Sequence, residues 1–283
     1  MPKIAIVTDT NASLPTELIA RHSIRMVPIP VHFGAETLLS CAEIDDAALF
    51  ARVHHGGSYP TTSAPSPGQF ASAYQAALDS GAEEVICFCM SSAASATYSS
   101  ALQAREMTPA GKIHVVDTQR LSLGMGFMVL SAAEAAEAGA TSQEIMDLAQ
   151  DVSRRTHFFA ALATLKYLAM SGRVSHLRAG VGDLLHFKPI LSIHEGKLSL
   201  RERVRTQSRA WQRLIELARQ SLDGGQAARM AILHVNDLPQ AQRFEQQVRT
   251  ALPCPDDIFF TEATPGISLH AGAGTIGLAL TKR

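Results

Sequence analysis

The sequence is poor in cysteine, and this shortage excludes two kinds of protein. Only four cysteines occur among 283 residues, at positions 41, 87, 89 and 254, and no two of them form a CxxC pair. Such spacing provides neither a disulfide framework nor a zinc site. Cys87 and Cys89 are two residues apart in one expected strand, a separation unsuited to a disulfide. We therefore expect reduced thiols, as in a cytoplasmic protein.

The sequence also lacks an excess of either charge and a long apolar run. Its 25 basic and 26 acidic residues give a net charge of −1, whereas nucleic-acid and membrane surfaces attract a basic stripe. The nearest candidate, the four arginines of Leu200–Arg209, is interpreted as a strand with a solvated face. The most apolar stretch, Ser122–Ala138, is interrupted by two glutamates and predicts a largely buried helix. We expect no nucleic-acid partner, no stable membrane insertion and, because the first residues lack a signal-peptide pattern, a cytoplasmic location.

Several enzyme motifs are missing as well. The sequence contains no Walker A motif, no GxSxG elbow and no HExxH pair. A formal GxGxxG occurs within His270–Gly277, but only six residues follow it, too few for the βαβ unit of a dinucleotide site. The adjacent His54 and His55 have no cysteine or acidic cluster to complete a metal site. We therefore expect no catalytic residues, no metal and no cofactor.

The first half of the sequence alternates short apolar runs with helical stretches, which is typical of a parallel sheet wrapped by helices. The expected strands are Lys3–Val7, Ile24–Val31, Glu84–Met90 and Ile113–Asp117. Ser66 is expected to cap one helix, and the residues after Thr141 form a capping box that opens another. This pattern predicts a Rossmann-like α/β domain over residues 1–157.

The pattern of strands changes after residue 157. Strands are expected at Phe158–Ala163, Phe187–His194 and Lys197–Val204, and the last two are joined by Glu195 and Gly196 as a β-hairpin. Two further strands then alternate with helices, at Met230–Val235 and Asp257–Glu262. Residues 158–283 are therefore predicted to form an α+β domain with a mixed sheet, which makes the whole protein α/β with two domains.

Three polar segments are candidates for a binding site. Thr8–Asn11 follows the first strand, at the edge where open α/β sheets bind ligands, although it is equally consistent with a helix cap. Thr61–Pro67 carries four hydroxyls on a backbone stiffened by prolines. Ser91–Tyr98 opens a helix, and backbone N–H groups at such a position bind carboxylate or phosphate. Here too an ordinary cap remains an alternative.

Three isolated side chains also have two interpretations each. Arg173 and Arg205 can pair with a phosphate or an acidic partner, or can simply be solvated. His270, in a glycine-rich stretch, is either a hydrogen-bond donor to a ligand or a core histidine with its hydrogen bonds satisfied.

Taken in order, these segments resemble the DegV family, which is similar to the fatty-acid-binding subunits of bacterial fatty acid kinase. The resemblance extends over nearly the whole chain. It rests on eight pieces at family-like spacings, namely Thr8–Thr10, Thr62–Ser66, Ser91–Tyr98, Val116–Thr118, Gly172–Ser175, Lys188–Pro189, Val204–Thr206 and His270–Gly274.

The resemblance implies a carrier rather than an enzyme. It implies one long-chain fatty acid (C14–C18, such as the hexadecanoate palmitate or stearate) held between the two domains, with its carboxylate presented to a partner ATP-dependent fatty acid kinase for acyl-phosphate formation. Thr62 and Ser95 would grip the carboxylate, with His270 nearby. Arg173 and Arg205 would lie toward the head group or the kinase-docking face. The loop residues expected to line the site are Asp9, Ser63, Ser92, Ala96 and Thr97.

The sequence departs from the family pattern at two positions. Ala96 stands where the family often has glycine, and Ala64 where a glutamine is common. Both positions border the expected head-group site. Two other functions stay open at this point: an acyl-ester hydrolase using Ser95 with His270 as base, and a regulatory or structural partner that only shares the fold.

Overall fold

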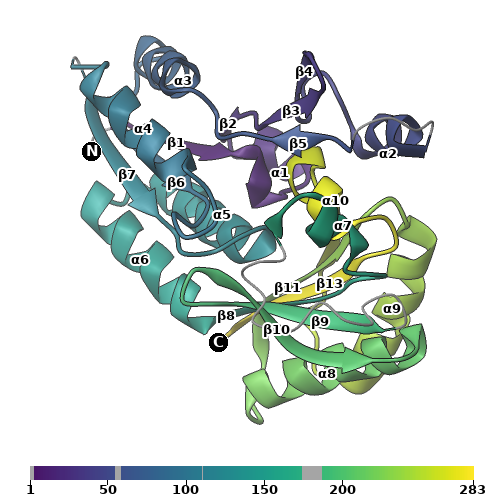
Figure 1. The fold of residues 1–283 in the computed structure, drawn as a ribbon. Coiled ribbons are helices and arrows are strands. Elements are labelled where there is room, and N and C mark those ends of the chain that lie inside the picture. Colours follow the sequence, from purple (N-terminus) through teal and green to yellow (C-terminus); the bar gives the residue numbers. More distant parts are fainter. Residues whose placement is uncertain (1–2, 55–58, 110, 174–186) are drawn as a thin grey trace.

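Strands from the first half of the chain form a four-stranded parallel sheet, which confirms the predicted class for this half. Figure 1 shows the fold in a computed structural model that describes residues 3–54, 59–109, 111–173 and 187–283. The strand order is β2 (Arg25–Val27), β1 (Ile4–Asp9), β6 (Glu84–Cys89) and β7 (Lys112–Asp117). Strand β6 is buried along almost its whole length, because helices cover both faces of the sheet.

Two helices lie on each face of this sheet. On the outer face are α3 (Pro67–Asp79) and α4 (Thr97–Glu106), where Phe70 and Tyr74 pack against Val7 and Cys87. On the inner face are α5 (Leu123–Glu137) and α6 (Ser142–Arg155). The capping boxes predicted at the starts of α3 and α6 are both present.

The second half of the chain forms a mixed sheet, as predicted, but it has six strands where five were expected, because the strand at Ile276–Lys282 was not predicted. Its order is β10 (Lys197–Val204), β9 (Lys188–His194), β8 (Thr156–Ala161), β13 (Ile276–Lys282), β11 (Ala227–His234) and β12 (Ile258–Glu262). Only β11 and β12 pair in parallel. Glu195 and Gly196 form the predicted tight turn, with φ of 48° and 75°. Positive φ at both positions is the requirement of a two-residue hairpin turn.

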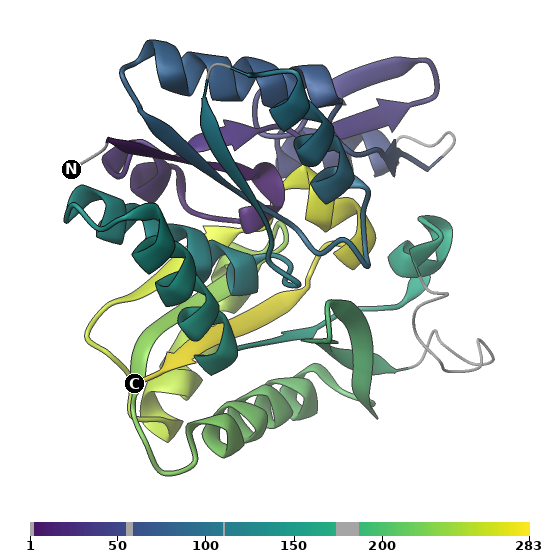
Figure 2. The same ribbon diagram turned by 90° about the vertical axis from the view of Figure 1, so that its left-hand side faces the viewer.

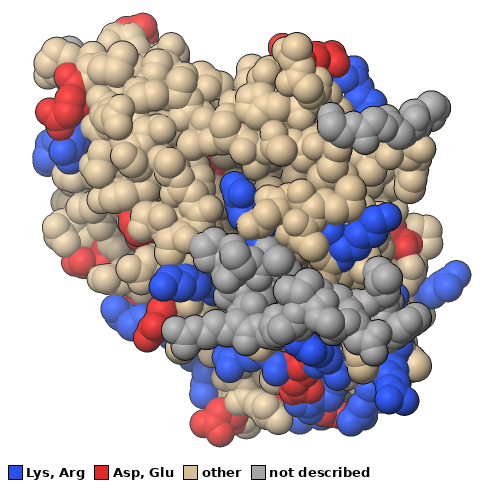
Figure 3. All heavy atoms as spheres, in the orientation of Figure 1, with Lys and Arg blue, Asp and Glu red and all other residues tan. Residues whose placement is uncertain are grey.

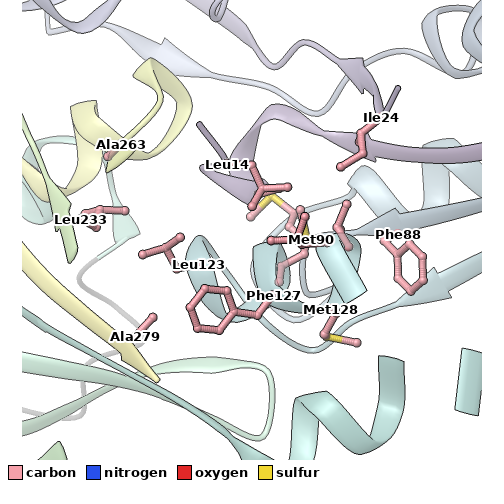
Figure 4. Close-up of a cluster of buried hydrophobic side chains, with 14 of the residues drawn as sticks. Leu14, Ile24, Phe88, Met90, Leu123, Phe127, Met128, Leu233, Ala263 and Ala279 are labelled. Carbon is pink, nitrogen blue, oxygen red and sulfur yellow. The ribbon is translucent and has the colours of Figure 1, made fainter. Parts of the chain in front are cut away.

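The two sheets and their helices stack in five layers (Figure 2). Helices α8 (Gln207–Leu222) and α9 (Leu238–Ala251) cover the outer face of the second sheet, while α5 and α6 lie between the sheets. Figure 4 shows Leu123 and Phe127 of α5 between Leu233 and Ala279 on one side and Met90 on the other. Helix α5 is therefore apolar nearly all round, as its sequence predicted.

One predicted strand was wrong. Ile24–Val31 was expected to be continuous, but it divides into β2 and β3 (Pro30–Phe33), which belong to different sheets. The reason is that Pro28 and Pro30 have no N–H to offer a sheet ladder, and the amide of Ile29 between them donates to Thr10 Oγ1 at 3.1 Å. Strand β3 instead pairs with β4 (Glu36–Leu39) and β5 (Thr61–Thr62) in a small antiparallel sheet that was not predicted.

Short helices complete the described structure. They are α1 (Thr16–Arg21), α2 (Asp46–His54), α7 (Lys166–Met170), α10 (Pro265–Ala271) and a 3₁₀ turn, Thr10–Ala12. Helix α10 packs against α2, α7 and β3, so it carries C-terminal residues across to the first half of the chain. The boundary predicted between residues 157 and 158 falls within β8. Across the described ranges, no helix combines the length and apolarity that a bilayer crossing requires.

Two glycines of α5 give a test of how tightly this central helix is packed. A Cβ on Gly126 would lie 2.4 Å from the carbonyl oxygen of Ala12, whereas a Cβ on Gly124 would meet nothing closer than 3.6 Å. We expect Gly126→Ala to lower the free energy of unfolding by about 1–3 kcal/mol, because a backbone atom must move. Gly124→Ala, the matched control, should leave stability unchanged or slightly raised. Urea denaturation measures both, and equal effects would contradict this account of the packing.

Candidate ligand-binding site

A largely apolar cavity of about 150 Å³ lies between the two halves of the chain. One water needs only about 10–15 Å³, so the cavity is large enough for a substantial ligand. Its apolar wall includes Ile29, Met90 and Leu121 from the first half and Phe158, Leu191 and Leu233 from the second. The cavity is thus built jointly by the two sheets and by the start of α5.

Thr62 and His270 meet in the wall of this cavity although 208 residues separate them in sequence. Thr62 is held in β5 by pairing with Val31 of β3, and His270 lies in the last turn of α10. Thr62 Oγ1 is 3.1 Å from His270 Nε2. The predicted head-group residues of the two segments are therefore in direct contact.

The imidazole of His270 is neutral at physiological pH. Burial of the ring, aided by the positive charge of Arg173, lowers its pKa to about 3. Nδ1 is buried and has no hydrogen-bond partner among the described residues. The ring can therefore place its single proton on either nitrogen, and its bond with Thr62 can run in either direction.

Ser95 lines the cavity just before α4. Its Oγ is 2.8 Å from Thr97 Oγ1 and accepts a hydrogen bond from the amide of Thr97 at 3.2 Å. The serine thus closes a local turn before α4, whose N-cap residue is Ala96, and also lies in the cavity wall. Ser95 and His270 share no hydrogen bond in the described structure; the partner of each is a threonine.

The other predicted loop residues fall into two groups. Ser63 lines the cavity together with Ala64, one of the two departures from the family pattern. The residues that do not line it, as far as the structure describes them, are Asp9, Ser92, Ala96 and Thr97.

Two of the residues outside the cavity wall hold nearby loops in place. Asp9 is fully buried and accepts hydrogen bonds from the amides of Asn11 and Met90, at 3.0 and 2.9 Å. Its burial raises its pKa to about 6. Ser92 donates to Asp117 Oδ2 at 2.5 Å. Asn11, the last residue of the candidate segment Thr8–Asn11, does line the cavity.

The two candidate arginines lie in different environments. Arg173 lines the cavity and donates to the carbonyl of Ser171 at 3.3 Å, whereas Arg205 is exposed after β10 and does not line the cavity. Val174 and Ser175, part of the same family-like turn, lie outside the described residues. On the face shown in Figure 3, Lys and Arg side chains are more frequent over the lower half of the molecule than over the upper half.

The β9–β10 hairpin reaches from the second sheet onto the serine loop of the first half. A Cβ on Gly196, at the tip, would lie 2.6 Å from Ser91 Oγ and 3.6 Å from the Cβ of Ala93. Ile193 and Leu198, on the two strands of the hairpin, line the cavity. The hairpin therefore forms part of the cavity wall, and the absence of a side chain at Gly196 permits this close approach.

The buried carboxyl group of Asp46 holds α10 through a hydrogen bond with Ser268. Asp46 begins α2, and its Oδ2 accepts a hydrogen bond from Ser268 Oγ of α10 at 2.5 Å. Burial raises the pKa of Asp46 to about 8, and its Oδ1 has no partner among the described residues. No sequence motif marked this residue, because its role depends on a contact 222 residues away.

Comparison with known proteins gives full-length matches. A protein-family model described as "Uncharacterised protein, DegV family" matches residues 3–283. A DegV domain-containing protein of Mycobacterium bovis is 36% identical over 280 residues, covering 98% of this chain and 96% of its own. A DegV domain-containing protein of Streptomyces coelicolor is 33% identical and covers 99% of both chains.

Solved structures of DegV family proteins also match this chain over its whole length. A DegV family protein from Thermus thermophilus, described in terms of fatty acid binding, is 31% identical and superposes with a TM-score of 0.92. DegV from Bacillus subtilis, described as a fatty acid binding protein, is 28% identical with a TM-score of 0.90. Both matches cover 100% of each chain.

The buried acid behind α10 predicts a pH dependence of stability. Because the folded pKa of Asp46 is about 8, against about 3.8 when unfolded, the folded state binds the extra proton and loses stability as the pH rises through this window. We expect a loss of up to about 1.4 kcal/mol per pH unit between pH 6.5 and 8. Asp46→Asn should remove most of this slope, as measured by urea denaturation across the range.

The neighbouring Asp45 provides the control. Its Oδ1 accepts a hydrogen bond from the amide of Ala48 at 2.8 Å, a role that asparagine retains. Asp45→Asn should therefore keep a slope, moved to somewhat lower pH, because the charge of Asp45 is a minor cause of the raised pKa of Asp46 after burial. An unchanged slope in Asp46→Asn would show that another group is responsible.

Proposed function

This chain belongs to the DegV family, and on that premise we propose that it binds one long-chain fatty acid in the cavity between its two halves. The observation that carries the proposal is an apolar cavity whose wall also contains Thr62, Ser95 and His270. The full-length relatives from Thermus thermophilus and Bacillus subtilis, described as binding fatty acids, support it. The acids expected are C14–C18, such as palmitate or stearate.

The apolar wall supplies the main free energy of binding. Each buried methylene contributes ~0.8 kcal/mol, so the chain of palmitate contributes on the order of 11 kcal/mol. This transfer free energy offsets the entropic cost of immobilising a flexible ligand. The tail therefore provides affinity, and the polar groups determine where the carboxylate lies.

The hydroxyls of Thr62 and Ser95 can hold a carboxylate without a buried ion pair. A carboxylate removed from water needs hydrogen-bond donors. When neutral His270 carries its proton on Nε2, it donates to Thr62 Oγ1 and leaves the threonine hydroxyl proton for the ligand. Arg173, in the same wall, adds a positive charge. The low pKa of His270 keeps this arrangement available across the physiological range.

The finer role that we propose is substrate presentation. The chain would offer the carboxylate to an ATP-dependent fatty acid kinase in the cytoplasm, where a carboxylate oxygen attacks the γ-phosphorus of ATP, ADP leaves and an acyl phosphate forms. Arg173 lines the cavity and Arg205 is exposed at the end of β10, so the first suits the phosphorylated head group and the second suits a docking partner.

Ligand binding tests the proposal directly. Native mass spectrometry of the purified protein should show the added mass of one C14–C18 acid. Thr62→Val and Ser95→Ala should each weaken palmitate binding to delipidated protein by roughly 10- to 100-fold, since a hydrogen bond to a charged group contributes about 1.5–3 kcal/mol. Thr61→Val, the exposed neighbour in β5, is the matched control and should bind normally. Protein that never carries or binds an acid would refute the proposal.

Presentation to the kinase requires a separate experiment. With a DegV-type fatty acid kinase and ATP, Arg173→Ala and Arg205→Ala should lower the rate of acyl-phosphate formation by about tenfold or more. Arg205→Ala should keep the palmitate affinity of the wild-type protein, because the residue does not line the cavity. Arg154→Ala, an exposed arginine of α6, is the control. Unchanged rates in both variants would leave binding intact but exclude this docking face.

A further inference from the structure

A second, polar pocket lies where β8 and β9 separate. The two strands pair only along Phe159–Ala161 of β8 and Ile190–Ser192 of β9. The first three residues of β8, Thr156, His157 and Phe158, therefore have no paired residue of β9 on that side. The pocket that occupies this opening has a volume of about 40 Å³, more than one water requires but too little for a nucleotide or a peptide.

Basic side chains from three separate elements converge on this pocket. Arg120 comes from the segment before α5, His157 from β8 and Arg201 from β10. The six remaining residues of the wall are Gly124, Thr156, Phe158, Phe159, Ser192 and Ile193. No acidic residue is among the described residues that line it.

The two guanidinium groups are held in position but keep free donors. Arg120 donates through Nε and Nη2 to the hydroxyl and carbonyl of Ser153, at 2.9 and 2.7 Å. Arg201 donates through Nε to Ser192 Oγ at 2.8 Å. Within the described ranges, neither arginine forms an ion pair, and Nη1 of Arg120 and both Nη atoms of Arg201 have no partner. Such fixed, partly free forks match the geometry of an oxyanion.

The electrostatics of the pocket indicate a missing negative charge. The pKa of His157 is lowered by burial and then by the positive charges of Arg120, Lys282 and Arg201. Burial also lowers the pKa of Arg120 itself. A cationic group that is partly removed from water, such as Arg120, is normally paired, yet the described structure gives its guanidinium only the neutral hydroxyl and carbonyl of Ser153.

We propose that this pocket binds a small oxyanion of the phosphate or sulfate class, held by Arg120 and Arg201 with His157 as a further donor. The site is distinct from the acyl cavity and does not depend on what that cavity holds. Phe158, Ser192 and Ile193 nevertheless line both, so the two ligands would share a wall.

Titration calorimetry at low ionic strength in a chloride buffer tests the proposal, with inorganic phosphate added to the full-length, lipid-loaded protein. The wild-type protein should show saturable binding with one site. Arg201→Gln and Arg120→Gln should each weaken it by about tenfold or more, as expected for a lost charge-assisted hydrogen bond. Arg203→Gln makes the same charge change at an exposed position of β10 that does not line the pocket, and should bind phosphate normally.

Parallel measurements keep the result interpretable. Thermal unfolding shows whether each variant is folded, and Arg201→Gln, at an exposed position, maintains the test if Arg120→Gln does not fold. Native mass spectrometry of the same samples reports lipid occupancy, so failure of the acyl site is recognised separately. A second titration with phenyl phosphate distinguishes sources: equal affinity supports a phosphoryl group on a larger molecule, and much weaker binding supports the free anion. No saturable binding of either ligand, or equal weakening in Arg203→Gln, would overturn the proposal.

Discussion

The burial of α5 between two sheets is the constraint on which the rest of the structure depends. Both sheets pack against this one helix, so its diameter sets their separation. Beyond its N-terminal end the helix no longer fills the space, and Leu121 and Ser122 there line the cavity. The cavity is thus a consequence of where α5 begins. Its tight contact at Gly126 with the carbonyl of Ala12 fixes that position.

The polar side of the site depends on two elements of the second half, α10 and the β9–β10 hairpin, that pack against the first half of the chain. Helix α10 belongs to the C-terminal half but packs on α2 and β3, which brings His270 to Thr62. The hairpin tip at Gly196 similarly contacts Ser91. The polar groups of the cavity wall are therefore aligned only when both halves are folded and docked. This explains why the family-like segments are scattered over the whole sequence.

Local features of the fold could be predicted from the sequence, and features set by distant contacts could not. Three of the four strands of the parallel sheet, the capping residues Ser66 and Thr141 and the turn at Glu195 each follow from short-range chemistry. Strand β5 has only two residues and α10 only seven, too few for a periodic pattern. Among the predicted site residues, Thr62, Ser63, Ser95, Arg173 and His270 come together around one cavity. Asp46, whose environment depends on a tertiary contact with Ser268, was missed.

The strands of the second sheet are paired over unequal lengths, and the shortest pairing separates the β9–β10 hairpin at the edge from the rest of the sheet. Strands β8 and β9 share three paired positions, whereas β9 and β10 share seven and β13 and β8 share six. Fraying begins where a ladder has the fewest hydrogen bonds to lose, so local opening of this sheet is expected first between β8 and β9. Because Ile193 and Leu198 of this hairpin line the cavity, separation of β9 from β8 would uncover the cavity while both sheets stay folded.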